Sequence, residues 1–295
     1  TQVYYASNTL FQPMDDRREM LSLSEEKYIN QHTALSKIIG FTIETRPDQI
    51  SPEQIKRCLS YGVTRVQIGV QHTDNRILKK INRQCTIEDA IDAIHLLKDA
   101  GLKVQTHWMP NLPGATPELD VAMFDRAIYS HTLQSDDWKI YPTIVTKTAD
   151  RDEKEVYTVI EKWYNDGKYV PYSMEEVKQV ILHAMIRVPR HVRISRVFRD
   201  IPMINIEGGA NVPNLREELH QIMDANGDVC ECIRSREVKD RRVDPEDIHL
   251  CVHEFKASYA REFFISFESK EKKTEERVLH SFLRLRLPNK NYNTN

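Results

Sequence analysis

Along residues 1–205, short runs rich in β-branched residues alternate with longer amphipathic stretches, and this alternation limits the fold more than any other feature. It is typical of a parallel sheet whose strands are connected by helices. We expect six strands, at residues 3–6, 38–44, 64–70, 102–109, 138–142 and 192–198. The pattern predicts an α/β fold, either an open doubly wound sheet or, as we favour, a partial (β/α) TIM-like barrel.

Helix-end signals support these strand-to-helix units. Ser51 is placed to cap a helix over residues 52–61, and a proline occupies its first position. Thr86 begins a Thr-x-Glu-Asp capping sequence for a helix over residues 86–100, and Gly101 follows its end. A further helix is predicted over residues 213–226.

Beyond residue 205 the pattern changes, so we expect a second part of the molecule. Residues 206–268 are dense in Cys, His and Arg and are predicted to form a small linker module. Residues 269–295 begin with a charged run, typical of a solvated loop, and continue with an isolated strand at 278–287. The expected organisation is therefore a barrel, a linker and a short C-terminal piece.

The composition is that of a folded chain, because 40% of the 295 residues are hydrophobic and 29% are charged. No apolar run approaches the roughly 20 residues that cross a bilayer, so no membrane partner is expected. The five cysteines are an odd number, and an intracellular chain of this type keeps them reduced, so metal binding or burial is expected for them. The expected location is cytoplasmic. The net charge of −2 leaves nucleic-acid binding to local basic clusters.

Polar residues follow the predicted strands, at the carboxyl edge where (β/α) folds place their chemistry. Glu44, Arg46 and Asp48 put two carboxylates and a guanidinium after one strand. They suit a ligand with amine and carboxylate groups, and a structural ion network is an equal alternative. Gln71, after the next strand, offers a donor and an acceptor. The later strands end in three further candidates, Met109, Lys139 and Tyr141.

Cysteine and histidine residues of the linker are candidate metal ligands. Cys230 and Cys232 are followed by His249, Cys251 and His253, and thiolate and imidazole groups are ligands that zinc prefers. The alternative is that Cys251 is a small core residue and that the two histidines face solvent. The sequence leaves both interpretations open.

Two clusters of arginine are candidate RNA contacts, because guanidinium groups bind phosphate with forked geometry. In the first cluster an arginine recurs at every third residue: Arg187, Arg190, Arg193, Arg196 and Arg199. The second cluster contains Arg234, Arg236, Arg241 and Arg242. The alternative for both is a solvated, ion-paired surface. We expect RNA binding from Arg193, Arg196 and Arg199 together with the second cluster.

Six strings, taken in order, resemble the catalytic subunit of the Elongator complex and its archaeal and bacterial relatives. They are GFTIETRPD at 40–48, YGVTRVQIGVQ at 61–71, KDAGLKV at 98–104, MPNLPG at 109–114, KIYPT at 139–143 and RDIPM at 199–203. The similarity runs from about residue 36 to residue 242. Six ordered strings are far more specific than any one of them.

This resemblance implies a partial (β/α) barrel of radical SAM type that binds S-adenosylmethionine, joined to a GNAT acetyltransferase that uses acetyl-CoA. Together they carboxymethylate the wobble uridine of tRNA. The resemblance places four residues in the S-adenosylmethionine pocket, Glu44, Arg46, Gln71 and Met109. It makes Lys139 and Tyr141 catalytic residues facing the uridine. The implied partners are tRNA and either other Elongator subunits or a second copy, and DNA is not expected.

The chain departs from the family in three places. The cysteine string that holds the family's four-iron, four-sulfur cluster does not occur in residues 1–295, and Ser7-Asn8 replaces two glycines beside the cofactor. Residues 282–287 resemble only the first strands of the acetyltransferase, so no acetyl-CoA site is expected and this chain alone is expected to be inactive. The alternative is a non-catalytic, degenerate radical-SAM-like module that binds tRNA or scaffolds partner subunits.

Overall fold

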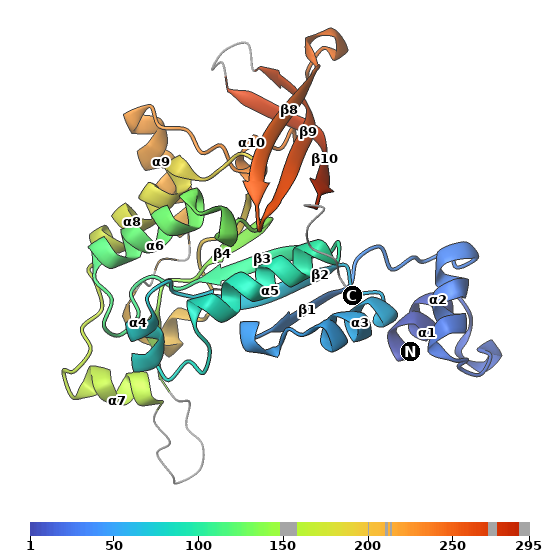
Figure 1. Cartoon of the computed structure of the whole chain (residues 1–295), viewed down its shortest axis with the longest axis horizontal. Helices are drawn as coiled ribbons and strands as arrows, with labels where there is room; N and C mark the ends of the chain where they lie inside the picture. The colour runs from blue at the N-terminus through green and yellow to red at the C-terminus, as the bar shows by residue number, and fades with distance from the viewer. Residues whose placement is uncertain (148–157, 200, 210–211, 213, 271–275, 289–295) are drawn as a thin grey trace.

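The computed structural model describes residues 1–147, 158–199, 201–209, 212, 214–270 and 276–288. Its centre is a five-stranded parallel sheet in the order β1-β2-β3-β4-β6 (Figure 1). The strands are β1 (Thr42–Thr45), β2 (Arg65–Gln71), β3 (Lys103–Trp108), β4 (Asp137–Ile140) and β6 (Arg193–Arg196). Because β1 and β6 are its two edges, the sheet is open, as in a partial barrel.

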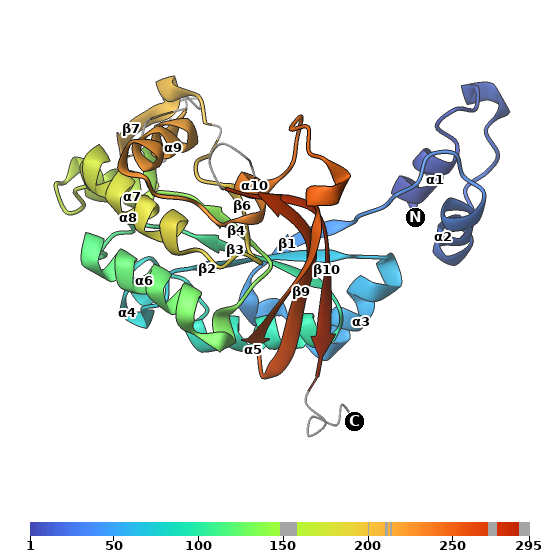
Figure 2. The same cartoon turned by 90° about the horizontal axis from the view of Figure 1, so that it is seen from above.

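Five of the six predicted strands are confirmed, and the first is wrong. Residues 2–8 form helix α1 (Gln2–Asn8), which packs against α2 (Leu23–His32), away from the parallel sheet (Figure 2). The hydroxyl of Tyr4 donates a hydrogen bond to the carbonyl of Tyr61 at 3.1 Å, so α1 lies beside the segment that leads into β2. A run with strand-like composition forms a strand only where a neighbour pairs with it, and here the backbone is satisfied within the helix.

The predicted helices next to the sheet are confirmed. They are α3 (Pro52–Tyr61) and α5 (Ile87–Asp99), and the expected caps are formed: Ser51 accepts from the amide of Gln54, and Thr86 forms a capping box with Asp89. The helix expected over 213–226 is α9 (Leu215–Asn226), and residue 213 lies outside the described residues. These ends are set by local hydrogen bonds, which is why the sequence predicts them.

The remaining elements are short or connect the others. The helices are α4 (Asn75–Lys80), α6 (Pro117–Tyr129), α7 (Val159–Asn165), α8 (Met174–Arg187) and α10 (Ile233–Arg236), with 3-10 turns at Met14–Asp16, Pro47–Gln49, His131–Leu133, Met203–Asn205 and Pro245–Asp247. Strands β5 (Ile144–Thr146) and β7 (Ile206–Gly209) form an antiparallel pair. In the described part of the chain, no helix combines the length and the apolar character needed to cross a bilayer.

The two faces of the parallel sheet differ in chemistry. One face carries apolar side chains such as Ile68 and Trp108, which are buried in the same core as the inner sides of α5, α6 and α8. The alternate residues of the same strands face the other way, among them Gln67, His107 and Lys139. A polar row therefore lines the inside of the open barrel and reaches its carboxyl edge.

The C-terminal part is a three-stranded antiparallel sheet in the order β10-β9-β8 (Figure 1). Its strands are β8 (His249–Ala257), β9 (Ala260–Lys270) and β10 (Arg277–Leu287). The expectation of an isolated strand at 278–287 is wrong, because β10 pairs with β9 along its length and so satisfies its backbone groups. The predicted boundary after residue 268 falls inside β9, and the charged run at 271–274 and the tail at 289–295 lie outside the described residues.

The two sheets meet at a buried cluster of charges. The ammonium of Lys98, on α5, lies 3.0 Å from a carboxylate oxygen of Glu262 and 3.3 Å from one of Asp136. Arg284 of β10 reaches the same oxygen of Asp136 at 2.9 Å. Asp136 also accepts the backbone N–H of Val104 at 2.8 Å, which ties the cluster to β3. Each charge is paired, as buried charges must be.

Candidate functional site

Five polar residues meet at the carboxyl edge of the parallel sheet: Glu44, Gln67, His107, Lys139 and Tyr141. Strand register brings them together, because Glu44 pairs with Gln67 across β1 and β2, and His107 pairs with Lys139 across β3 and β4. Tyr141 follows β4, and its backbone N–H donates to the carbonyl of Trp108 at 2.8 Å. The rings of His107 and Tyr141 meet edge to face with centroids 5.6 Å apart. We call these five residues the strand-end cluster.

Gln67 is the centre of the strand-end cluster. Its Oε1 accepts a hydrogen bond from Nζ of Lys139 at 2.7 Å and lies 3.2 Å from Nε2 of His107. Nδ1 of His107 lies 3.6 Å from Oε1 of Glu44, whose side chain is 64% exposed. The cluster is thus buried at His107 and open to solvent at Glu44.

Burial and nearby positive charges keep the ring of His107 neutral. Burial is the larger cause, and together with the nearby cations Lys139, Arg199 and Arg83 it lowers the pKa of His107 to about 4. Burial also lowers the pKa of Lys139, an effect that Glu44 opposes. Burial raises the pKa of Tyr141, so its hydroxyl keeps its proton at neutral pH. The cluster therefore offers a neutral imidazole, an ammonium and a phenol side by side.

Two arginines extend the cluster outward. The guanidinium of Arg199 lies over the ring of Tyr141, 4.9 Å from its centroid, which is within cation–π range. Arg196 ends β6 next to Lys139 in the register and interacts with the Tyr141 hydroxyl. Both arginines are exposed, so they present positive charge to solvent at the mouth of the cluster.

Gln71 and its neighbours form a second group at the same edge. Gln71 has a φ of 69°, and its Oε1 is buried with no hydrogen-bond partner among the described residues. Arg83 donates to the carbonyl of Gly69 at 2.7 Å, and a Cβ on Gly69 would come within 2.6 Å of that guanidinium. Met109 follows, with its N–H bonded to the carbonyl of Gln71 at 2.8 Å. An unsatisfied buried acceptor next to a glycine is a place for a donor group of a ligand.

Arg46 does not join Gln71 in the way the sequence suggested. Its guanidinium pairs with Asp48 at 2.6 Å and donates to Gln84 at 3.2 Å, which commits it to the turn after β1. Glu44, by contrast, turns toward His107. Glu44, Arg46 and Asp48 therefore do not act as one group: Arg46 and Asp48 form an ion pair in the turn, and Glu44 belongs to the strand-end cluster.

Ser7 and Asn8 lie away from the carboxyl edge. Ser7 donates to the carbonyl of Ser36 at 2.9 Å, and Asn8 donates to a carboxylate oxygen of Glu26 at 2.7 Å, both within the α1–α2 unit. This unit contacts the segment before β2, at the opposite end of the strand from Gln71. The expectation that Ser7-Asn8 replaces two glycines beside a cofactor is therefore wrong.

Sequence reasoning placed His107 at the carboxyl edge without giving it a role, and it missed Gln67 and Arg83. A signal for the first two was present, because polar residues at alternate positions of an otherwise apolar strand indicate a polar inner face. Arg83 carries no such signal. Its place in the site is visible only in the structure, where its guanidinium donates a hydrogen bond to the carbonyl of Gly69, 14 residues away along the sequence.

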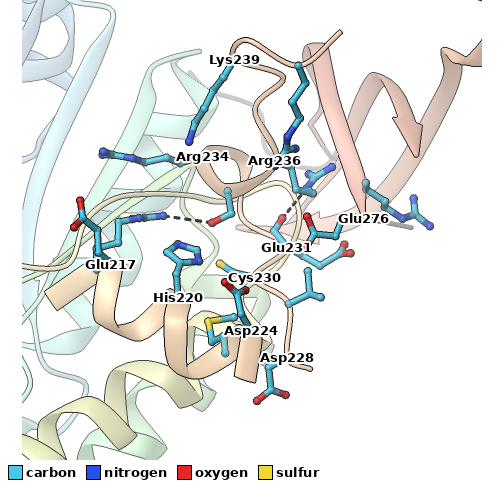
Figure 3. A pocket seen from close by; sticks show the side chains of 16 residues that line it. Glu217, His220, Asp224, Asp228, Cys230, Glu231, Arg234, Arg236, Lys239 and Glu276 are labelled. Atoms are coloured by element: carbon cyan, nitrogen blue, oxygen red, sulfur yellow. Dashed lines mark hydrogen bonds between the residues drawn. The ribbon is translucent and has the colours of Figure 1, made fainter. Parts of the chain in front are cut away.

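The predicted metal ligands Cys230 and Cys232 lie together next to a cavity of about 460 Å³, whose lining includes Cys230, His220 and Arg234 (Figure 3). A hydrogen bond from Cys230 lowers the pKa of Cys232 well below that of an ordinary thiol, and Ser235 and Arg216 act in the same direction. Among the described residues, no group of three or more His, Cys, Asp and Glu side chains could hold a metal ion. The zinc site therefore stays a prediction that rests on two thiols.

The four-iron, four-sulfur cluster does not fit the residues present. The five cysteines are all described, and they lie on separate elements except for the pair Cys230 and Cys232. Such a cluster needs several thiolates at one place.

The predicted RNA-binding arginines differ in availability. Arg236 is buried and ion-paired with Glu268 at 2.9 Å, so it is a structural residue. Arg193 pairs with Glu237, and Arg234 donates to the carbonyl of Ser195 while its side chain stays exposed. The other members are exposed except for Arg241, which is half-buried: Arg196, Arg199, Arg241 and Arg242.

Two family models match this chain. The family model of the Radical SAM superfamily matches residues 3–126, and that of the Radical_SAM C-terminal domain matches residues 135–225. The first covers β1, β2 and β3 with the Gln71 group, and the second covers β4 and β6 with Lys139 and Tyr141. The site is thus formed by residues from both matched regions, Gln71 from the first and Lys139 and Tyr141 from the second.

Individual relatives narrow the assignment. The tRNA uridine(34) acetyltransferase of Methanocaldococcus infernus is 40% identical over 93% of this chain and 50% of its own length. Elongator complex protein 3 of Saccharomyces cerevisiae is 32% identical over 91% of this chain and 46% of its own length. The solved structure of the archaeal Methanocaldococcus infernus Elp3 with an N-terminal deletion superposes with a TM-score of 0.84 at 38% identity, over 99% of this chain and 65% of that one.

The chain spans about half the length of these curated relatives. The sequence match covers 93% of this chain and the structural match covers 99% of it, so both include the strand ends that form the site. This chain is therefore a member of the radical SAM superfamily, in the family of the tRNA uridine(34) acetyltransferases and Elongator complex protein 3.

Proposed function

We propose that this chain is the tRNA-handling core of an Elongator-type enzyme that modifies the wobble uridine of tRNA. The strand-end cluster is the observation that supports this most, because it joins an ammonium, a phenol and a neutral imidazole beneath two exposed arginines. The names of the relatives specify tRNA uridine at position 34 as the target of those proteins.

In this proposal the parts of the site have separate roles. Arg196 and Arg199 contact RNA phosphates, which fix position without reading sequence. Lys139 and Tyr141 contact the uridine below them, and Lys139 keeps hydrogens available for a carbonyl oxygen because it uses one on Gln67. Arg236 is left out of the RNA surface, since it is buried against Glu268.

S-adenosylmethionine is the cofactor that the superfamily implies. Gln71 would accept a hydrogen bond from the amino group of its methionine end through the unpartnered Oε1, with Met109 next to it and Glu44 in the strand-end cluster at the same edge. Arg46 would act by holding the turn after β1 through Asp48. When bound, S-adenosylmethionine supplies radical chemistry in this superfamily. The residues of this chain would bind and orient it.

A second candidate function is a binding module without cofactor chemistry. It is favoured by one observation, that the exposed arginines Arg196 and Arg199 at the mouth of the strand-end cluster can bind phosphate without any cofactor. In this case the strand-end cluster holds tRNA, or the chain scaffolds other Elongator subunits or a second copy of itself.

The proposal is tested by equilibrium binding of the whole 295-residue chain to a tRNA and to a DNA hairpin of equal charge. Tighter binding of tRNA at the same salt concentration is expected. Equal binding of both would mean that the chain recognises only the charge of the nucleic acid, and this would refute the proposal. A calorimetric titration with S-adenosylmethionine separates the two candidates, because only the enzyme core should bind it, and a Gln71→Leu variant should lose that binding.

A further inference from the structure

The hydrogen bonds of Gln67 determine which nitrogen of His107 carries the proton. Nζ of Lys139 is a donor only, so the Gln67 atom 2.7 Å from it is the amide oxygen. The same oxygen lies 3.2 Å from Nε2 of His107, and an oxygen acceptor there requires Nε2 to donate. A neutral ring then has its lone pair on Nδ1.

That lone pair has no donor in the cluster. The atom facing Nδ1 is Oε1 of Glu44, 3.6 Å away, which is too far for a hydrogen bond and is itself an acceptor. The ring is buried and lies among the cations Lys139, Arg199 and Arg83, so protonation of Nδ1 is disfavoured at neutral pH. Glu44 lies next to Nδ1 and its side chain is 64% exposed, so a ligand would reach Nδ1 by displacing it.

The ammonium and the imidazole together match one edge of a pyrimidine. Uracil presents an N–H at position 3 between two carbonyl oxygens, whereas cytosine presents an unprotonated N3. Lys139 supplies donors for a carbonyl, and Nδ1 of His107 supplies an acceptor for N3–H. Single-stranded and extruded bases are read on this edge. A cytosine at the same place would set two lone pairs against each other.

We infer that Nδ1 of His107 accepts a hydrogen bond from N3–H of the target uracil and thereby selects uridine over cytidine. The inference rests on the proposed function and adds a base-reading residue to it. Lys139 positions the ring through Gln67 and contacts the neighbouring carbonyl, so the two residues act as a pair.

The experiment uses the whole chain and two anticodon stem-loops that differ only in uridine or cytidine at the wobble position. Fluorescence anisotropy is expected to show about tenfold tighter binding of the uridine form, the ratio expected for one good base contact. A third stem-loop with N3-methyluridine should bind like the cytidine form, because the methyl group removes the donor.

Two variants of the same residue give the matched comparison. In His107→Gln the amide nitrogen can donate to Gln67 while the acceptor at Nδ1 is lost, so the preference should fall to about one, with phosphate-driven affinity unchanged. In His107→Asn the side-chain oxygen takes the place of Nδ1, so part of the preference should remain. Thermal melts of both variants show whether they fold as the wild type does.

The outcomes distinguish failure of this inference from failure of the proposed function. If the wild type binds both stem-loops equally, or if His107→Gln keeps the preference, RNA binding stands and the inference is overturned. If neither stem-loop binds, the proposed function fails and the inference fails with it. A long-range proton–nitrogen NMR spectrum of the free protein is an independent readout, since a proton on Nδ1 of His107 would contradict the inference without any RNA.

Discussion

Removing one charge from the buried cluster between the two sheets should unfold the chain at a much lower temperature. Asp136→Asn keeps the size of the side chain and removes its charge, which leaves Lys98 with Glu262 alone and Arg284 without its carboxylate partner. Lys98, Asp136 and Glu262 are each at most 5% exposed, so solvent cannot compensate.

The size of the effect follows from this burial. Removing one partner from a buried ion pair costs about 3 to 5 kcal/mol, and here the cluster is left with one positive charge in excess, because Glu262 alone then faces both Lys98 and Arg286. At roughly 2 to 4 °C per kcal/mol for a chain of this size, Tm should fall by about 10 °C. Burial opposes ionisation of Asp136, but Lys98 and Arg284 lower its pKa strongly, so the carboxylate is charged at any pH used for such a melt.

The assay is a thermal or urea melt followed by circular dichroism, with Asp166→Asn as the matched control. Asp166 pairs with Lys168 at 2.8 Å on the surface, and both side chains are well exposed. Its loss should change Tm little, because exposed ion pairs contribute little to stability. If Asp136→Asn melts at the same temperature as Asp166→Asn, the two sheets are held by apolar packing, and the reasoning from buried charge is refuted.

Further predictions concern the site and the thiol pair. The Arg196→Ala, Arg199→Ala double variant should weaken binding of all tRNAs alike and flatten the salt dependence of log K by roughly 1.5 units, measured by filter binding across a salt series. The pKa of His107 drops from 6.5 to about 4 on folding, so stability should fall as pH is lowered from 6.5 toward 4, and His107→Gln should remove this pH dependence in urea melts. Zinc bound to the purified chain should disappear in the Cys230→Ser, Cys232→Ser variant, as measured by metal analysis.

Controls make these predictions specific. Arg261→Ala changes an exposed arginine on β9 that pairs with Glu254, and it should leave the salt dependence of tRNA binding unchanged. Cys58→Ser changes a half-buried thiol on α3 and should leave the zinc content unchanged. An Arg196, Arg199 variant with wild-type affinity would make these arginines structural, and equal zinc in the thiol variant would mean that its ligands lie elsewhere.

Local features were predictable wherever a few neighbouring residues decide the outcome. Ser51 and Thr86 mark the starts of α3 and α5, because a hydroxyl and the amides of the next turn are enough to form a cap. The parallel strands followed from their β-branched runs and the helices between them. Positions at strand ends, such as Gln71 and Lys139, followed from the rule that parallel strands end at one edge.

Predictions from the local sequence pattern were wrong where the outcome depends on which distant segment packs against the residues. Residues 2–8 look like a strand and form α1, since their contacts are with α2 and Tyr61. The strand at 278–287 looked isolated, because its partner β9 is recognised only from the pairing. Arg236 looked like its exposed neighbour Arg234, and burial against Glu268 is invisible in the sequence.

The sequence by itself determined the order of strands and helices, the family and the residue types available at the carboxyl edge. The tertiary structure alone decided which of them meet. Gln67 is 40 residues from His107 and 72 from Lys139, yet it binds both, and those two bonds determine where the imidazole proton lies. The physical reason is that capping and periodicity are short-range properties of the chain, whereas register and burial are set by distant segments that pack together.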